Sequence, residues 1–261
     1  MKKLLAATIA LMLVGLTDTY AQSLKKQTCN LVFIGNSITE GALHAEKTKT
    51  APPVIAAGEV GKALSCNVNF RNCGRSGATT VDFRPDRDTD FKRVRRAISD
   101  IQALSYEPII FSIMLGTNDS ANFGPNGAPV SNEDYKRNLL DMISEIRSLC
   151  DNAIFVLQQP IWYSPNTHNA SQYLVAGQKR MVGYTNVLIE LAAENSDIYL
   201  GDCDAFDFFS NKHEKYMFAE NGRAGVFYLH PNEQGAKKLA SYWATAIVRT
   251  IKSERKKQNL H

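Results

Sequence analysis

Short apolar runs alternate with longer amphipathic stretches along most of the chain. Each short run ends at a glycine or a polar turn, as buried strands do, whereas the longer stretches have the spacing of helices with one buried face. The pattern predicts strands over residues 30–34, 67–72, 108–115, 153–159 and 197–200. It predicts helices over residues 53–64, 90–104, 132–149, 171–194 and 232–251. Strands that alternate with helices indicate an α/β fold around a parallel sheet.

Parallel strands must be joined by crossover connections, and the crossover helices cover both faces of the sheet. Loops from different units then meet at the carboxyl ends of the strands, where sheets of this kind bind ligands. Candidate functional residues are therefore expected directly after the predicted strands.

The N-terminal segment has a different pattern. Two lysines at positions 2 and 3 precede an apolar run of 13 residues, and small residues follow up to Ala21. This order is typical of a secretory signal peptide, and the run is shorter than the roughly 20 residues that span a membrane. We therefore expect residues 1–21 to be removed and the protein to be exported, periplasmic or secreted, with no stable membrane anchor.

Residues 22–261 are enough for one α/β domain and too few for two ordinary domains with a linker. We expect a single domain with a short polar, basic tail from about residue 252. The formal net charge of +4 identifies no partner. A basic run lacks interleaved aromatic residues, which favours a solvated helix face over nucleic-acid binding. This run consists of Lys92, Arg93, Arg95 and Arg96.

The chain contains five cysteines but no Cys-x-x-Cys pair and no His-Glu-x-x-His motif. Neither a metal nor another cofactor is therefore expected. Cys29 and Cys66 each precede a predicted strand and would lie at one sheet edge if those strands are neighbours, so they are the expected disulfide pair. Cys73 has no basic residue placed by sequence to activate it, which favours a small buried residue over a nucleophile. Three aspartates at positions 202, 204 and 207 lack the order of a calcium loop and are interpreted as turn and helix caps.

Four candidate residues follow the predicted strands or precede the last helix. Ser37 lies in GNSITEG after the first strand, Gly74 in NCGRSG after the second, and Asn118 in GTND after the third. His230, in YLHPNEQG, directly precedes a helix that begins with proline. Each residue alone has an ordinary structural interpretation as a cap, a turn or a packed side chain. Their common position at the expected edge of the sheet favours a catalytic site.

In this order, GNSIT, NCGRSG, GTND and YLHPNEQG resemble the blocks of the SGNH (GDSL-like) hydrolase superfamily, and in particular exported carbohydrate O-acetyl esterases. The resemblance implies a three-layer α/β/α flavodoxin-like sandwich with a five-stranded parallel sheet in the order 2-1-3-4-5. It also implies that Ser37 is the nucleophile and His230 its base. The oxyanion hole would consist of the backbone N–H groups of Ser37 and Gly74 and the Nδ2 of Asn118.

These residue types suit ester hydrolysis through an acyl-enzyme. A serine hydroxyl becomes a good nucleophile when an imidazole accepts its proton, and the imidazole then returns that proton to the leaving group. Each preorganised donor to the oxyanion contributes about 10² to 10³ in rate.

The sequence departs from the family pattern at two positions. Asn36 replaces the usual Asp of the first block, a side chain with no assigned chemical step. Phe227 stands where the family commonly has the Asp that orients the histidine, and loss of such an acid can cost about 10⁴ in rate. His230 could instead be oriented by a backbone carbonyl or by another acid, with Glu220, Asp202 and Asp204 as candidates. The remaining alternative is an inactive relative that binds carbohydrate.

Loops over residues 120–129 and 160–169 are expected to border the site. Trp162 or Tyr163 would stack on a sugar ring, or would simply pack the loop onto the domain. Arg75 would reach an acidic substituent, or would be paired locally. The expected substrate is a small-molecule or polysaccharide ester, most simply an O-acetylated carbohydrate. The alternative enzyme is a lysophospholipase or thioesterase that acts on acyl chains.

Overall fold

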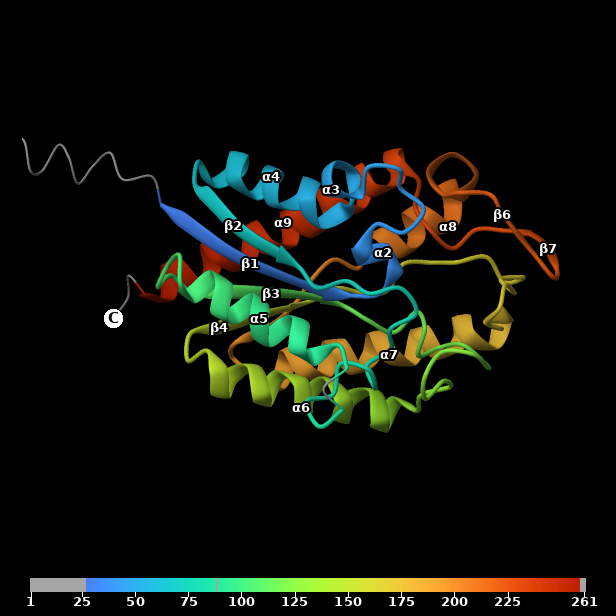
Figure 1. The fold of residues 1–261 in the computed structure, drawn as a ribbon, viewed down its shortest axis with the longest axis horizontal. Helices are drawn as coiled ribbons and strands as arrows, with labels where there is room; N and C mark the ends of the chain where they lie inside the picture. Colours follow the sequence, from blue (N-terminus) through green and yellow to red (C-terminus); the bar gives the residue numbers. More distant parts are fainter. Residues whose placement is uncertain (1–26, 88, 259–261) are drawn as a thin grey trace, which may run out of the picture.

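The structure is a computed structural model that describes residues 27–87 and 89–258 (Figure 1). Its main sheet has five parallel strands in the order β2-β1-β3-β4-β5. They are β1 (Thr28–Gly35), β2 (Asn67–Asn72), β3 (Ile109–Met114), β4 (Ala153–Leu157) and β5 (Ile198–Leu200). The predicted parallel sheet and its order are therefore confirmed.

Helices cover both faces of this sheet, as Figure 1 shows. One face is covered by α4 (Pro52–Leu64), α8 (Ala205–Tyr216) and α9 (Glu233–Gln258). The other is covered by α5 (Phe91–Gln102), α6 (Asn132–Leu149) and α7 (Leu174–Glu194). Successive residues of a strand point to opposite faces. Accordingly, Leu31 and Phe33 of β1 pack in one core cluster, and Val32 and Ile34 pack in the other. The expected three-layer sandwich is the result.

Several short elements were not predicted. They are α2 (Ser37–Glu40), α3 (Lys47–Thr50), β6 (Glu220–Gly222) and β7 (Gly225–Phe227), together with the longer α8. The last helix also continues to Gln258, beyond its predicted end at residue 251. Arg255, Lys256 and Lys257 lie in its last turn, where the partial negative charge of a helix C-terminus favours cations. The segment expected as a polar tail is therefore largely helical.

Within residues 27–87 and 89–258, none of the helices is both long enough and apolar enough to cross a membrane. The predicted signal peptide, residues 1–21, lies outside the described residues.

Candidate active site

Ser37 is the first residue of α2, directly beyond the end of β1. Asn36 caps this short helix, because its side-chain Oδ1 accepts a hydrogen bond from the Ile38 N–H at 3.0 Å. The turn is tight: a Cβ on Gly35 would lie 2.0 Å from Thr39 Oγ1. Strand, cap and glycine together place the Ser37 hydroxyl at the carboxyl edge of a central strand of the sheet.

His230 lies between Ser37 and an acid. Its Nε2 is 2.8 Å from Ser37 Oγ, and its Nδ1 is 2.9 Å from Glu220 Oε1. A carboxylate only accepts, so the Nδ1–H donates to Glu220 and leaves the Nε2 lone pair for the serine proton. The side chains of His230 and Glu220 are only 12% and 17% exposed. The structure therefore aligns a serine, a histidine and a glutamate in the order that a hydrolytic triad requires.

Glu220 is held in place by the hairpin that β6 and β7 form. Its Oε1 also accepts the backbone N–H of His230 at 3.2 Å. The loop after β4 secures the hairpin and the residue after it, because Ser164 exchanges two hydrogen bonds with the Tyr228 backbone and Asn166 Nδ2 donates to Val226 O at 2.8 Å. Of the three acids considered from the sequence, Glu220 is the one that contacts His230.

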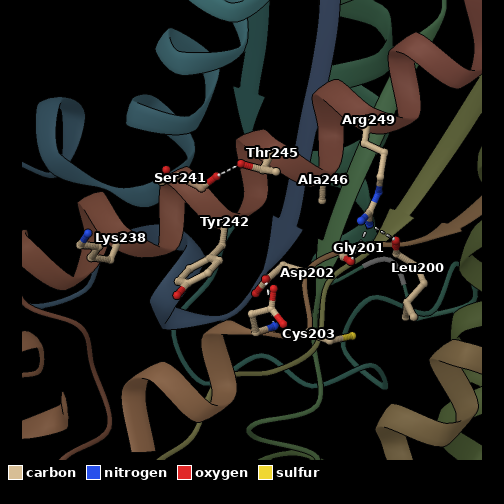
Figure 2. Close-up of a pocket in the computed structure, with 11 residues that line it drawn as sticks. Leu200, Gly201, Asp202, Cys203, Lys238, Ser241, Tyr242, Thr245, Ala246 and Arg249 are labelled. Carbon is tan, nitrogen blue, oxygen red and sulfur yellow. Dashed lines mark hydrogen bonds between the residues drawn. The ribbon is translucent and has the colours of Figure 1, made fainter. Parts of the chain in front are cut away.

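Asp202 occupies a different place, at the carboxyl end of β5 (Figure 2). Its carboxylate accepts the backbone N–H groups of Asp204 and Ala205, each at 3.1 Å, and so caps the start of α8. The interpretation as a turn and capping residue is thus confirmed for Asp202, whereas Asp204, at the N-cap position of α8, makes no side-chain cap hydrogen bond. Asp202 and Asp204 line a cavity of about 570 Å³ together with Tyr242 and Arg249 of α9. Neither aspartate is bonded to His230 there.

Asn118 is buried beside the loop that follows β2. Its Nδ2 donates to Ala78 O at 2.8 Å, and its Oδ1 accepts from the Tyr173 hydroxyl at 2.6 Å. An amide nitrogen carries two hydrogens, so one donor remains for a substrate oxygen. Tyr173 thus fixes which side of the amide carries the donors. Sequence reasoning missed Tyr173, because it lies in no motif and is far from Asn118 along the chain.

Gly74 packs directly against α2. A Cβ on Gly74 would lie 2.3 Å from Glu40 N, so no other residue fits this contact. Its N–H donates to Asn72 Oδ1 at 2.9 Å, and Asn72 Nδ2 in turn donates to Thr39 O at 2.8 Å. The Gly74 donor is therefore engaged within the protein, and a substrate oxyanion would have to share it with Asn72 or replace Asn72.

The model of the GDSL-like lipase/acylhydrolase family matches residues 33–238. The chain belongs to this family. It is accordingly an ester hydrolase of the SGNH type. No curated protein sequence matches the chain.

Solved structures of esterases have the same fold as this GDSL-like hydrolase. A carbohydrate acetylesterase from Sinorhizobium meliloti is 13% identical with a TM-score of 0.58, over 85% of this chain and 99% of that one. An acetyl-xylooligosaccharide esterase from Geobacillus stearothermophilus, solved as a mutant, is 20% identical with a TM-score of 0.57, over 86% and 96% of the two chains. An aryl esterase from M. smegmatis is 14% identical with a TM-score of 0.57, over 86% and 99%.

Two of the residues expected to bind substrate in this GDSL-like hydrolase have other contacts. Tyr163 is fully buried, and its hydroxyl is bonded to Ser120 at 2.9 Å, so the expectation that it stacks on a sugar is wrong. Trp162 is half-buried and packs against the ring of His213, with 4.8 Å between ring centroids. The packing role that we considered for these aromatic residues therefore describes Tyr163 fully and Trp162 in part.

The other residues named from the sequence are placed as follows. Arg75 is bonded within the protein through each of its three guanidinium nitrogens, which favours local pairing over contact with substrate. Cys73 is buried, and burial raises the pKa of its thiol to about 12, so the thiol is a poor nucleophile. Among the described residues, no group of three or more His, Cys, Asp or Glu side chains is placed to hold a metal ion.

Proposed function

We propose that this GDSL-like hydrolase is an exported serine esterase that removes O-acetyl groups from carbohydrates. The observation that carries the catalytic assignment is the hydrogen-bonded series from Ser37 through His230 to Glu220. Ser37 acts as the nucleophile, His230 as the general base and acid, and Glu220 as the group that orients the imidazole.

In the first half of the reaction, Ser37 Oγ attacks the carbonyl carbon of the ester while its proton moves to His230 Nε2. Glu220 stabilises the imidazolium that forms. The tetrahedral oxyanion is bound by the free N–H of Asn118 Nδ2, by the backbone N–H of Ser37 and by that of Gly74, which the oxyanion shares with Asn72 Oδ1 or takes from it. Collapse of this intermediate breaks the bond to the sugar oxygen, which takes the proton from His230 and leaves an acyl-serine.

In the second half, His230 removes a proton from water as the water attacks the acyl-serine. A second tetrahedral intermediate forms at the same donors. When it collapses, the carboxylic acid leaves and Ser37 recovers its proton from His230. No other group is required to move a proton, which is consistent with the single histidine bonded to Ser37.

The choice of an acetylated carbohydrate is supported by two of the similar structures, which are described as a carbohydrate acetylesterase and an acetyl-xylooligosaccharide esterase. The surroundings of the nucleophile are also polar. Glu40, one helical turn beyond Ser37, accepts hydrogen bonds from Ser76 and Lys47. A leaving group that is rich in hydroxyls suits these polar surroundings better than a long acyl chain does. Export is supported by the pattern of residues 1–21.

The experiment compares the mature protein with Ser37→Ala, His230→Ala and, as a control, Ser241→Ala on the exposed side of α9. Acetate release from acetylated oligosaccharides and hydrolysis of p-nitrophenyl esters of increasing chain length are measured. We expect activity in the parent and control, its loss in the other two variants, and a preference for acetyl esters.

Other outcomes would favour the alternatives. A preference for long acyl chains would indicate a lysophospholipase or thioesterase. Carbohydrate binding without any ester hydrolysis by the parent would indicate an inactive relative. The sequence basis for that last alternative was Phe227, and the contact of Glu220 with His230 supports an active site instead.

A further inference from the structure

The loop that joins β2 to α5 contacts both the helix of the nucleophile and the side chain of Asn118. The Arg75 N–H donates to Gly35 O at 3.0 Å, and Ser76 donates from its N–H and its hydroxyl to the Glu40 carboxylate at 2.8 and 2.7 Å. At its other side, Ala78 O accepts from Asn118 Nδ2 at 2.8 Å. The position of the Gly74 N–H relative to Ser37 and Asn118 therefore depends on the conformation of this loop.

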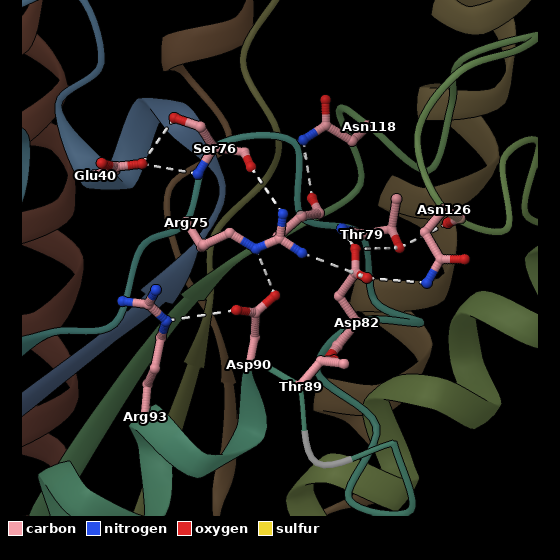
Figure 3. A network of polar contacts seen from close by, with 11 residues as sticks. Glu40, Arg75, Ser76, Thr79, Asp82, Thr89, Asp90, Arg93, Asn118 and Asn126 are labelled. Atoms are coloured by element: carbon pink, nitrogen blue, oxygen red, sulfur yellow. Dashed lines mark hydrogen bonds and ion pairs between the residues drawn. The ribbon is translucent and has the colours of Figure 1, made fainter.

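Arg75 joins the beginning of this loop to its end, as Figure 3 shows. Its Nε donates to Asp90 Oδ2 at 2.6 Å, and Asp90 is the residue before α5. Its Nη1 donates to Ser76 O at 3.1 Å, and its Nη2 lies 3.5 Å from Asp82 Oδ1. One planar guanidinium thus reaches three separate points of the loop.

The two carboxylates beneath this guanidinium are buried. The side chains of Asp82 and Asp90 are only 7% and 6% exposed, whereas that of Arg75 is 36% exposed. A buried carboxylate is costly unless a cation and hydrogen bonds compensate it. Arg93 supplies a second cation to Asp90 at 3.4 Å, and Asn126 donates to Asp82 at 2.9 Å. Without Arg75, the loop would hold two buried acids with one nearby cation.

Asp82 extends the network to the far side of the loop. Its Oδ2 accepts the backbone N–H of Thr79 at 2.9 Å, which is next to Ala78, the partner of Asn118. The ion pairs of Arg75 therefore help to fix the backbone beside both expected oxyanion donors. One is the N–H of Gly74, the neighbour of Arg75, and the other is Asn118 Nδ2, which contacts Ala78 O.

We propose that Arg75 is a positioning residue that aligns the oxyanion hole, because its ion pairs with Asp82 and Asp90 fix the conformation of the loop that joins β2 to α5. The inference rests on the esterase function proposed above. Oxyanion donors bind the transition state much more strongly than the ground state, so their misalignment lowers kcat and leaves KM nearly unchanged. A role in binding an acidic substrate would do the reverse, since loss of uniform binding raises KM.

Arg71 provides a matched control. It lies on β2, just before the loop, and its Nε is 3.1 Å from Asp100 Oδ2. Its side chain is 37% exposed, almost the same as that of Arg75, and its pair lies on the strand and α5 outside the loop. A general effect of losing one half-exposed ion pair of an arginine would therefore appear equally in the Arg75 and Arg71 variants.

The experiment measures kcat and KM on p-nitrophenyl acetate, together with thermal stability, for the parent, Arg75→Ala, Arg75→Lys and Arg71→Ala. We expect Arg75→Ala to lower kcat about 100-fold with KM within about twofold, the size of one lost oxyanion donor. Arg75→Lys retains the positive charge but not the several N–H donors of the planar guanidinium. Relative to Arg75→Ala, it should therefore regain the thermal stability of the parent but only part of its kcat. Arg71→Ala should keep kcat within about twofold of the parent.

Three results would overturn the inference while leaving the esterase proposal intact. They are an active parent with kcat unchanged in Arg75→Ala, an equal loss of kcat in Arg71→Ala, and a rise in KM at constant kcat. If Arg75→Ala does not fold, Arg75→Lys with full parental kcat overturns the inference in the same way. A parent without any esterase activity would instead overturn the proposed function, and this inference with it.

Discussion

Glu220 and Phe227 lie directly opposite one another in the β6–β7 hairpin. Phe227, at the position where the family commonly has its acid, is almost fully buried in the core and so cannot serve His230. The facing strand supplies the carboxylate instead, 2.9 Å from His230 Nδ1. The buried Phe227 therefore packs the hairpin onto the core, and Glu220 on the facing strand supplies the carboxylate that contacts the histidine.

Replacement of Glu220 tests this arrangement. Glu220→Gln keeps the size of the side chain but allows its amide to donate, which favours the wrong imidazole tautomer and removes the charge that stabilises the imidazolium. We expect kcat to fall by about 10³ to 10⁴. The control is Asp202→Asn, since Asp202 was an alternative acid and Asn caps helices nearly as well. Esterase assays that show full activity in Glu220→Gln, or an equal loss in Asp202→Asn, would refute the assignment.

The main sheet could be predicted from the sequence because most of its strands are apolar runs that end at clear turns, whereas β2, at the edge of the sheet, alternates polar and apolar residues. β1 and β3 are buried along almost their whole length, and α6 was predicted with its observed bounds, 132–149. The hairpin β6–β7 could not be predicted in this way. Each of its strands has three residues, and β7 has two exposed residues followed by one buried residue, which is too short a segment to show an alternating pattern.

The site was predictable where one residue sits next to a sheet strand, as Ser37 does. It was not predictable where a partner arrives from a distant loop. Tyr173 is 55 residues from Asn118, and Glu220 was only one of three candidate acids. For Arg75 both contact with substrate and local pairing stayed open, because a sequence cannot show that two buried aspartates lie beneath it.

The Tyr173 hydroxyl is expected to contribute to catalysis through Asn118. Tyr173→Phe preserves the buried ring but leaves Asn118 Oδ1 without its donor, so only the bond from Nδ2 to Ala78 O still orients the amide toward the oxyanion. We expect kcat to fall about tenfold, the effect of one buried hydrogen bond. Tyr199→Phe is the control, because that hydroxyl is bonded to Lys257 at the edge of the sheet. Equal kcat values in the two variants would show that Tyr173 has no such role.

Cys29 and Cys66 are expected to form a disulfide in an oxidising compartment, which the proposed export would provide. The structure has them as free thiols with their Sγ atoms 2.9 Å apart, 37 residues apart in sequence. Burial and the neighbouring Cys66 side chain raise the pKa of Cys29 to about 12, so spontaneous oxidation is slow and an oxidising compartment with its catalysts is required. The cross-link should stabilise the fold by about 3 to 4 kcal/mol.

Mass spectrometry of the unreduced, alkylated protein checks the disulfide. We expect three alkylated cysteines and one Cys29–Cys66 peptide, and a lower melting temperature for Cys66→Ser than for the parent. Cys150→Ser, a buried cysteine without a cysteine partner, is the control. Five alkylated cysteines in protein purified from an oxidising compartment would contradict the prediction.

Asp119, next to Asn118, should make stability depend on pH. Burial raises the pKa of its carboxyl to about 6, although hydrogen bonds from Thr80 oppose this, and its Oδ2 has no partner among the described residues. A carboxyl whose pKa is higher in the folded state binds more protons there than in the unfolded chain between pH 4 and pH 6. Its contribution to the free energy of unfolding is therefore fully present below about pH 4 and is lost as the pH rises to about 6.

Asp119→Asn removes this titration and keeps an oxygen for the Thr80 N–H. The free energy of unfolding of the variant relative to the parent should rise on the order of 3 kcal/mol between pH 4 and pH 6 and stay constant above. Urea titrations at several pH values measure the difference, and Asp134→Asn, a partly exposed acid in the first turn of α6, is the control. A difference that is flat across this range would mean that Asp119 stays ionised in the folded protein, with its charge compensated by Thr80 and by the buried Asn138, whose Nδ2 donates to Thr80 Oγ1 at 3.0 Å.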